Sequence, residues 1–399
     1  MKKLVFLLFL TIGISFAQEK NQIKLSTEAT FSVVTCGPGT ELYSSFGHSA
    51  FRLKDPVYGY DMVYNYGTFD FNTPLFYIKF AQGKLPYQLG RARFRDFVNT
   101  YKREKRWVKE QVLNLSPDQV SKLLAYLENN YKEENRNYKY DFFFNNCATK
   151  KRDIMKENFN DDIVFHENHI TTTDKTFRDL IHDNLNPNSW SSFGIDIALG
   201  AVIDKKAKPD DYHFLPEYVF KAFENATLKG SSVPLVSEVK VILKAPENVK
   251  SKSNILMSPY VIFSILLAIV LIVTFLDFKN KKRTRWLDAS LLLISGLGGI
   301  MIVLLWFATD HSMTVTNMNI LWLMPINIFF VRKFLLKRKE CKALWKHTAT
   351  LIGLIVIMLF LWLIDFQQFA LAAIPLIVMF TVRYVYLTYY FLNITKDKP

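Results

Sequence analysis

Cysteine is scarce in this chain of 399 residues, which contains only Cys36, Cys147 and Cys341. Three cysteines are too few for a disulfide-rich scaffold. No histidine stands beside cysteines at the spacing of a zinc site, and no glycine-rich phosphate-binding motif occurs. The sequence therefore predicts no metal site and no nucleotide or other cofactor.

Basic residues are missing from two stretches of the apolar C-terminal part, 309–317 and 365–368, although the formal net charge of the chain is +14. Lysine and arginine are concentrated instead at 279–285 and 332–346. Positively charged loops stay in the cytoplasm, so loops without them face outward. The basic excess thus reflects membrane topology and predicts no nucleic-acid partner.

Five apolar runs follow a change of composition near residue 255, and most are long enough to cross the bilayer core. The runs lie at about 256–276, 287–307, 319–333, 348–365 and 369–392. The third run is the shortest. We predict a bundle of five transmembrane α-helices over residues 255–399, with the preceding domain outside.

The N-terminus has the pattern of a secretory signal. Lys2 and Lys3 precede the apolar run Leu4–Ile14, which is followed by small residues ending at Ala17. We predict a signal peptide over 1–17; an uncleaved anchor would export the next segment equally. Residues 18–246 then form one exported catalytic domain, and 247–254 form a linker.

A possible nucleophile lies in the stretch YDFFFNNCATKKR, residues 140–152. The run Phe142–Phe144 favours a short buried strand, and Asn146 is a good N-cap for a helix that starts at Cys147. At this position unpaired N–H groups and the helix dipole favour a thiolate. The basic run Lys150–Arg152 adds positive charge.

A cysteine nucleophile needs a histidine that takes and returns a proton. His48 follows Gly47 and precedes the predicted strand 49–53, whereas the other exported histidines lie in loop-like sequence. A disulfide between Cys36 and Cys147 is the alternative role for this sulfur.

The motifs FGHSAFRL and NNCATKKRD place His48 and Cys147 in this order, 147 − 48 = 99 residues apart. Together they resemble the Lnb N-terminal periplasmic domain family, which is similar to a permuted branch of the NlpC/P60, papain-like cysteine enzymes. The resemblance covers roughly residues 28–215, and the five-span region resembles the arrangement in the same family. It implies an α+β, permuted NlpC/P60 (papain-like) exported domain in the periplasm.

By this resemblance, His48 is the base and Cys147 the nucleophile. Asn65, in the segment VYNYG, is the expected third member, with Tyr64 or Tyr66 as alternatives. These two tyrosines and Asn146 are also expected to contact substrate.

The outward loop before residue 320 contains Asp310 and His311. We include both as candidate substrate-binding residues, because a polar cluster at the outer interface can contact lipid head groups. The simpler interpretation is an ordinary solvated loop.

The resemblance implies an inner-membrane lipoprotein N-acyltransferase. Its acyl donor would be a membrane phospholipid, and its acceptor the α-amine of a diacylated lipoprotein. Two alternatives remain open from the sequence, a peptidoglycan peptidase or amidase of the NlpC/P60 type and a non-enzymatic membrane scaffold.

Overall fold

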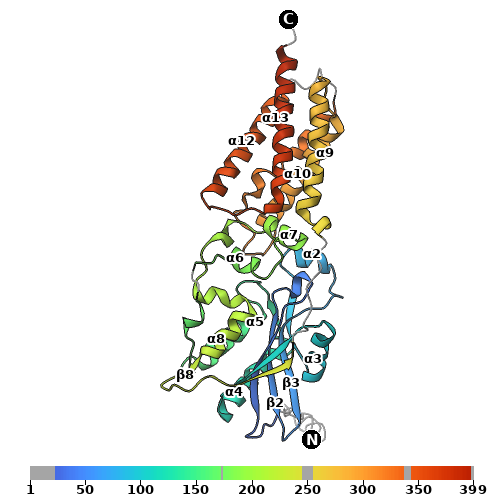
Figure 1. The fold of residues 1–399 in the computed structure, drawn as a ribbon. Coiled ribbons are helices and arrows are strands. Elements are labelled where there is room, and N and C mark those ends of the chain that lie inside the picture. Colours follow the sequence, from blue (N-terminus) through green and yellow to red (C-terminus); the bar gives the residue numbers. More distant parts are fainter. Residues whose placement is uncertain (1–22, 172–173, 245–254, 337–342, 397–399) are drawn as a thin grey trace, which may run out of the picture.

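The computed structural model describes residues 23–171, 174–244, 255–336 and 343–396. The predicted signal peptide, the predicted linker and Cys341 lie outside these ranges. A part that contains a β-sheet and a part made of long helices are stacked end to end (Figure 1). The mixed α+β part is followed by apolar helices, as the sequence predicts.

The core of the first part is an antiparallel sheet of seven strands in the order β6-β4-β3-β2-β1-β5-β9. Its strands are β1 (Thr30–Cys36), β2 (His48–Asp55), β3 (Tyr60–Thr68), β4 (Pro86–Arg93), β5 (Val108–Leu113), β6 (Asn137–Lys139) and β9 (Val236–Leu243). The predicted strand at 49–53 is confirmed as the interior of β2. A separate two-stranded sheet pairs β7 (Ile163–Val164) with β8 (Thr227–Leu228).

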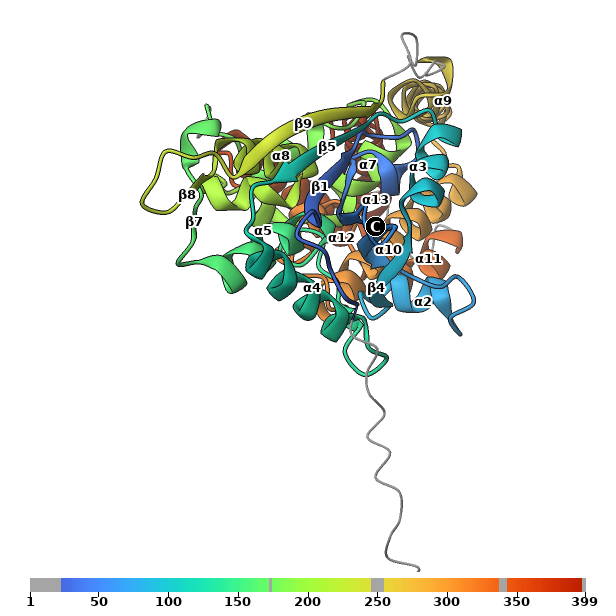
Figure 2. The ribbon, with the colours of Figure 1, turned by 90° about the horizontal axis from the view of Figure 1, so that it is seen from below.

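Helices cover both faces of the large sheet, with α3 (Phe94–Arg103) on one side and α4 (Pro117–Tyr131) and α5 (Cys147–Phe159) on the other (Figure 2). Successive side chains of a strand point to opposite faces. In β3, Val63 packs with the helix α3, whereas Tyr64 and Tyr66 pack in the core beneath α4 and α5. Further short elements are α2 (Phe76–Ala81), α6 (Phe177–His182), α7 (Trp190–Ala198) and α8 (Pro216–Asn225).

The segment Phe142–Phe144 is a turn, so the predicted buried strand is wrong. The Asp141 carboxylate accepts hydrogen bonds from the backbone N–H groups of Phe143 and Phe144, at 2.8 and 3.0 Å. Asp141 and Asn145 also pair across the turn. An aspartate that binds the backbone two residues on favours such a turn over a strand, and of the three rings the turn buries that of Phe143.

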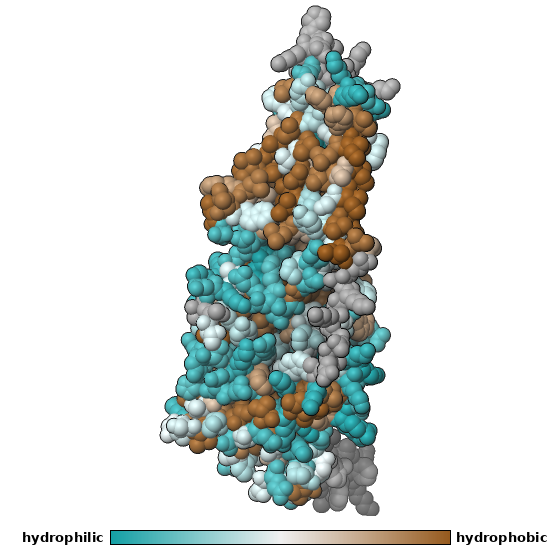
Figure 3. Space-filling view, in the orientation of Figure 1, coloured by the Kyte–Doolittle hydropathy of each residue, from teal (hydrophilic) through white to brown (hydrophobic). Residues whose placement is uncertain are grey.

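Four described helices are long and apolar enough to cross a membrane, and they match four of the five predicted spans. They are α9 (Pro259–Lys279), α10 (Arg285–Phe307), α12 (Leu344–Leu363) and α13 (Ile374–Lys396). Their outward side chains make a nearly continuous apolar surface, in contrast to the more hydrophilic sheet-containing part (Figure 3).

The third predicted span, 319–333, is not one long helix. It consists of a 3-10 turn (Met318–Leu321), a non-helical stretch around Pro325 and the short helix α11 (Asn327–Leu335). Proline disfavours a helix before it, and the glycines of α10 let this irregular backbone approach closely. A Cβ atom on Gly299 would lie 2.0 Å from the Leu323 carbonyl oxygen.

Irregular backbone is tolerated at membrane depth when protein surrounds it. The segment nevertheless runs back along α10. At its far end, the side chain of Arg283, just before α10, donates to the carbonyl of Phe334 in α11, 2.7 Å away.

A buried ion network joins the middle of α13 to the cytoplasmic ends of α9 and α10. Arg383 of α13 has no exposed surface and donates to Asp288 of α10 at 2.7 Å and to Asp277 of α9 at 2.8 Å. Asp288 also accepts from Arg283 at 2.9 Å. Charges inside a membrane protein require such partners, and removing one leaves an uncompensated charge.

The two parts are joined through the end of α7. The side-chain amide of Asn317 donates to the Ile197 carbonyl at 2.8 Å, and that of Asn319 donates to the Asp196 carbonyl at 3.0 Å. Beyond α7, the Gly200 N–H donates to the Met313 carbonyl at 3.0 Å. The two asparagine bonds satisfy carbonyls that the end of α7 leaves unpaired. All three bonds fasten the exported part to the outer end of the bundle.

This junction predicts opposite effects for two glycine substitutions. A Cβ atom on Gly200 would lie 1.8 Å from the Val315 carbonyl oxygen, so Gly200→Ala forces the two parts apart. We expect it to lower the free energy of unfolding by about 1–3 kcal/mol, as overpacking does.

Gly194 lies within α7, and a Cβ atom added to it would have nothing within 4 Å, so Gly194→Ala is the matched control. It should be neutral or stabilise by up to about 1 kcal/mol. Thermal unfolding of the two variants in detergent measures the difference, and equal melting temperatures would contradict the packing described for Gly200.

Candidate active site

Cys147 is the first residue of α5, and Asn146 is its N-cap, as the sequence predicts. The Asn146 side-chain oxygen accepts from the N–H groups of Ala148 and Thr149, at 2.7 and 2.9 Å. Its amide nitrogen donates to the carbonyls of Phe142 and Phe214, both at 2.7 Å. Asn146 is buried and uses its whole side chain to hold the start of this helix.

This cap decides which helical amides remain for an incoming oxyanion. The N–H groups of Ala148 and Thr149 are already taken by Asn146. The N–H of Cys147 itself is the first-turn amide that the cap does not use. The Ser49 N–H faces the sulfur and stabilises its negative charge.

His48 begins β2 opposite Cys36 of β1. Its Nε2 atom lies 2.6 Å from the side-chain oxygen of Asn65 in β3. Because an amide oxygen only accepts, Nε2 carries the hydrogen and donates it. The other ring nitrogen, Nδ1, is thus left to exchange a proton with Cys147, and the ring of Tyr101 stacks beside the imidazole.

The surroundings of Cys147 favour its thiolate. Burial raises the pKa of the thiol, but the positive charge and hydrogen bond of His48, the charge of Lys151 and the Ser49 N–H outweigh burial and lower the pKa to about 7. Cys147 is buried, with 8% of its surface exposed. A thiolate beside an imidazolium is suited to attack a carbonyl carbon.

Lys151 lies one turn after Cys147 and has no exposed surface. Its ammonium lies 5.2 Å from the Phe51 ring centre and 5.0 Å from that of Tyr66, and no hydrogen-bond partner is found for it among the described residues. Burial lowers the pKa of Lys151 to about 7. In the sequence, this lysine appears only as part of a basic run. Helical spacing places it one turn after Cys147 but does not show that the sheet buries it.

Cys36 and Cys147 are both free thiols, so the alternative of a disulfide between them is not realised. Cys36 is buried against Tyr101, and burial raises the pKa of its thiol far above the usual range. Of these two cysteines, only Cys147 has an environment that favours the reactive form.

The structure thus brings Cys147, His48 and Asn65 together. Tyr64 points from β3 to the face opposite Asn65, beneath α4 and α5, where its hydroxyl donates to Glu128 at 2.5 Å. Tyr66 is also on that face, but it borders the Lys151 ammonium and immediately precedes Gly67. A Cβ atom on Gly67 would lie 3.7 Å from the Cys147 Cβ, so this glycine leaves the space beside the cysteine open.

Asp310 and His311 lie at the boundary between the two parts. Asp310 forms an ion pair with Lys139 at 3.1 Å, and its N–H donates to the Gln82 carbonyl at 2.8 Å. The His311 ring lies 3.1 Å from the Ala81 carbonyl. This loop packs against the exported part. The interpretation as an ordinary solvated loop did not predict these contacts.

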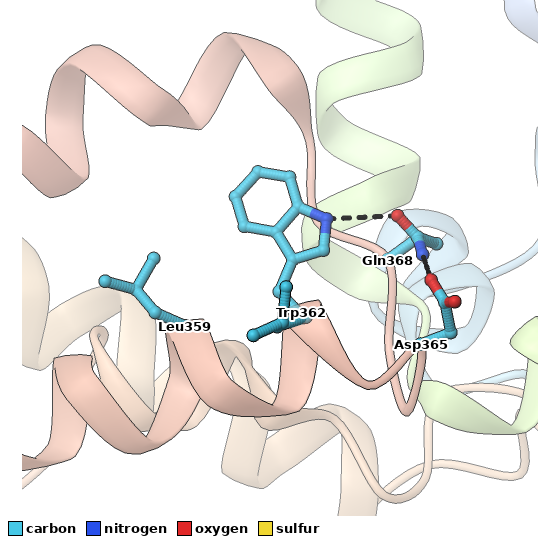
Figure 4. A pocket seen from close by; sticks show the side chains of 5 residues that line it. Leu359, Trp362, Asp365 and Gln368 are labelled. Carbon is cyan, nitrogen blue, oxygen red and sulfur yellow. Dashed lines mark hydrogen bonds between the residues drawn. The ribbon is translucent and has the colours of Figure 1, made fainter.

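Two surface hollows lie away from Cys147. One is at the outer end of α12, where the Trp362 indole donates to Gln368 at 3.0 Å and Gln368 donates to Asp365 at 2.6 Å (Figure 4). The other is lined by residues that include Trp107 and Phe220. Within the described ranges, no group of three histidine, cysteine or acidic side chains is arranged to hold a metal ion.

Two family models match the chain. The model of the Lnb N-terminal periplasmic domain matches residues 16–181, and that of the Lnb transmembrane domain matches residues 250–396. No curated protein and no solved structure gives a significant match. The matches agree with a periplasmic domain on a multi-pass inner-membrane protein, while the similarity to permuted papain-like enzymes stays a prediction.

The low pKa of Cys147 predicts how its alkylation depends on pH. Iodoacetamide should modify Cys147 faster as pH rises through about 7, because the thiolate fraction increases. His48→Ala removes the main influence that lowers this pKa and should slow the reaction at pH 7 at least about tenfold. Mass spectrometry of the Cys147 peptide gives the rate.

Cys36 is an internal control in the same experiment, because burial keeps it a thiol. A Cys147 rate that rises only above pH 9 in the unaltered protein would contradict the described environment.

Asn65→Ala tests the bond to His48 without altering the sulfur. Loss of a hydrogen bond to a charged imidazolium should lower the rate of Cys147 acylation about 10- to 150-fold. Asn65→Asp retains an acceptor and should keep more of the rate than Asn65→Ala. An alanine variant with an unchanged rate would show that Asn65 does not orient His48.

Proposed function

Because the chain carries the Lnb periplasmic domain and the Lnb transmembrane domain, it belongs to the Lnb family, and we propose that it is a lipoprotein N-acyltransferase. Cys147 is the proposed nucleophile, His48 the proton carrier and Asn65 the residue that orients His48. The observation that supports this best is the position of Cys147. It lies at the start of a helix and beside His48, where the thiolate is favoured over the thiol.

In the first step, the Cys147 thiolate attacks an ester carbonyl of a membrane phospholipid. A carbon–sulfur bond forms, and the ester carbon–oxygen bond breaks. The His48 imidazolium gives its proton to the departing alkoxide, so that a lysophospholipid leaves. The Cys147 N–H is the proposed donor to the developing oxyanion.

In the second step, the α-amine of a diacylglyceryl-cysteine attacks the thioester. A carbon–nitrogen bond forms, and the carbon–sulfur bond breaks. Neutral His48 takes a proton from the amine, and the thiolate is restored. Water in place of the amine would give hydrolysis, so the acceptor must be favoured over water at the site.

The position of the site supports a lipid substrate. Cys147 follows a turn whose Asp141 carboxylate accepts a hydrogen bond from Ser312 of the outer membrane loop, at 2.7 Å. Lys139 forms an ion pair with Asp310 of the same loop. A nucleophile fastened in this way to the outer end of α10 is close to ester groups of the outer leaflet, so neither acyl substrate has to enter water.

Acyl transfer is tested with the purified full-length protein in detergent, a phospholipid and a synthetic diacylated lipopeptide. We expect mass spectrometry to show an added acyl mass on the peptide amine. Cys147→Ala should abolish this product, whereas Cys36→Ser should retain most of it. A labelled phospholipid should also leave a thioester on Cys147.

Two further measurements separate the alternatives. Cleavage of muropeptides without acylation of the lipopeptide would indicate a peptidoglycan hydrolase. Full complementation of a deletion strain by both Cys147→Ala and His48→Ala would indicate a scaffold, and either result would contradict the proposed transfer.

A further inference from the structure

The exported part exposes an unusual set of apolar side chains between β3 and β4. Phe71 is 70% exposed, Leu75 68%, Tyr77 80% and Phe80 54%. The rings of Phe69, Phe71, Phe76 and Phe80 contact one another in a chain. We call residues 69–80 the aromatic turn; such a contiguous exposed patch marks an interaction surface.

The aromatic turn lies at the level where the membrane begins. The residues that directly follow it, Ala81 and Gln82, accept hydrogen bonds from the outer loop at His311 and Asp310. This loop comes directly after the outer end of α10 at Phe307. Figure 1 shows α2 just below the outer ends of the long helices, and Figure 2, seen from below, shows it on the same side as α10 and α11.

A line of rings connects the aromatic turn to Cys147. The rings of Phe69 and Tyr87 are 5.4 Å apart, and those of Tyr87 and Tyr140 are stacked at 4.2 Å. The space beside Gly67 borders both Tyr140 and Cys147, at 3.9 and 3.7 Å from a Cβ atom placed there. A chain of ring contacts thus links the exposed rings to the residues that border Cys147.

We propose that the aromatic turn lies in the outer leaflet of the membrane and is the entrance through which a phospholipid acyl chain reaches Cys147 along Phe69, Tyr87 and Tyr140. The occupant is the lipid bilayer because the turn is exposed and apolar and is held against the loop at the outer end of α10. Aromatic rings favour the interface between head groups and acyl chains. Lys79 and the exposed Lys84 flank the rings and suit anionic head groups.

The leaflet contact is independent of the reaction, whereas the delivery of an acyl chain to Cys147 rests on the proposed function. The test therefore reads lipid contact separately from chemistry. Full-length protein is reconstituted in vesicles of phosphatidylethanolamine and phosphatidylglycerol that contain a phospholipid with a photoreactive diazirine on its acyl chain. After illumination, mass spectrometry maps the labelled peptides.

We expect labels on the aromatic turn, on Tyr87 or Tyr140, and on the long helices. The triple variant Phe71→Ser, Tyr77→Ser and Phe80→Ser should reduce labelling of the turn and of the ring path about tenfold, because burial of even one large apolar side chain changes an equilibrium by that factor. The corresponding triple leucine variant should restore labelling, since lipid contact requires apolar surface.

Tyr58→Ser is the matched control. Tyr58 is also an exposed aromatic residue, at 45%, but it lies in the turn between β2 and β3 at the opposite end of the sheet from His48. This variant should leave labelling unchanged. Labels on the helices but none on the aromatic turn of the unaltered protein would overturn the proposal.

Two further readouts separate this inference from the proposed function. Acetylation of Cys147 by water-soluble p-nitrophenyl acetate should be the same in the triple serine variant as in the unaltered protein, while acyl transfer from vesicle phospholipid falls about tenfold. Equal loss of both reactions would indicate a damaged site and overturn the entrance. Labelling of the turn without any lipopeptide acylation in the unaltered protein would overturn the proposed function and leave the leaflet contact standing.

Discussion

The hydrogen bonds of Asn146 are the constraint on which the site depends. This one side chain caps α5, binds the turn before it through Phe142 and binds the segment before α8 through Phe214. A capping asparagine stabilises a helix by about 1 kcal/mol, but here the same group also sets where Cys147 stands relative to the sheet. Because the cap uses the N–H groups of Ala148 and Thr149, it leaves the Cys147 N–H outside the cap. One side chain thus determines both the position of Cys147 and which amides of the first turn remain beside it.

The membrane part contributes to the same construction. Asp141 forms the turn before Asn146 with one carboxylate oxygen and accepts from Ser312 with the other. The outer loop therefore contacts the turn that precedes Cys147, and through Asp310 it contacts Gln82, just after the aromatic turn. A bundle that served only as an anchor would not need contacts on both sides of the site. The bundle instead holds the turn that precedes Cys147 at its outer end.

Local patterns in the sequence were sufficient for the helix start at Cys147, the strand after His48 and four of the spans. Each depends on neighbours along the chain or on simple periodicity. The irregular course of the third predicted span was not predicted, because the glycines of α10 and the side chains of Asn317 and Asn319 decide its path, and their partners are distant in sequence. The strand at 142–144 failed because the Asp141 side chain outweighs the strand preference of phenylalanine. The pairing of Asn65 with His48 came from the family resemblance, and the burial of Lys151 required the sheet itself.

The buried lysine has a consequence for the direction of the proposed reaction. In the resting site, the negative sulfur favours the charged form of Lys151, against the burial that disfavours it. Acylation of Cys147 removes the negative charge, so the ammonium loses its favourable interaction and its pKa falls further. The acyl-enzyme therefore holds a less favourable charge arrangement than the free thiolate. In the proposed mechanism, attack by an amine restores the thiolate, so the attraction between the sulfur and Lys151 is regained when the thioester is consumed.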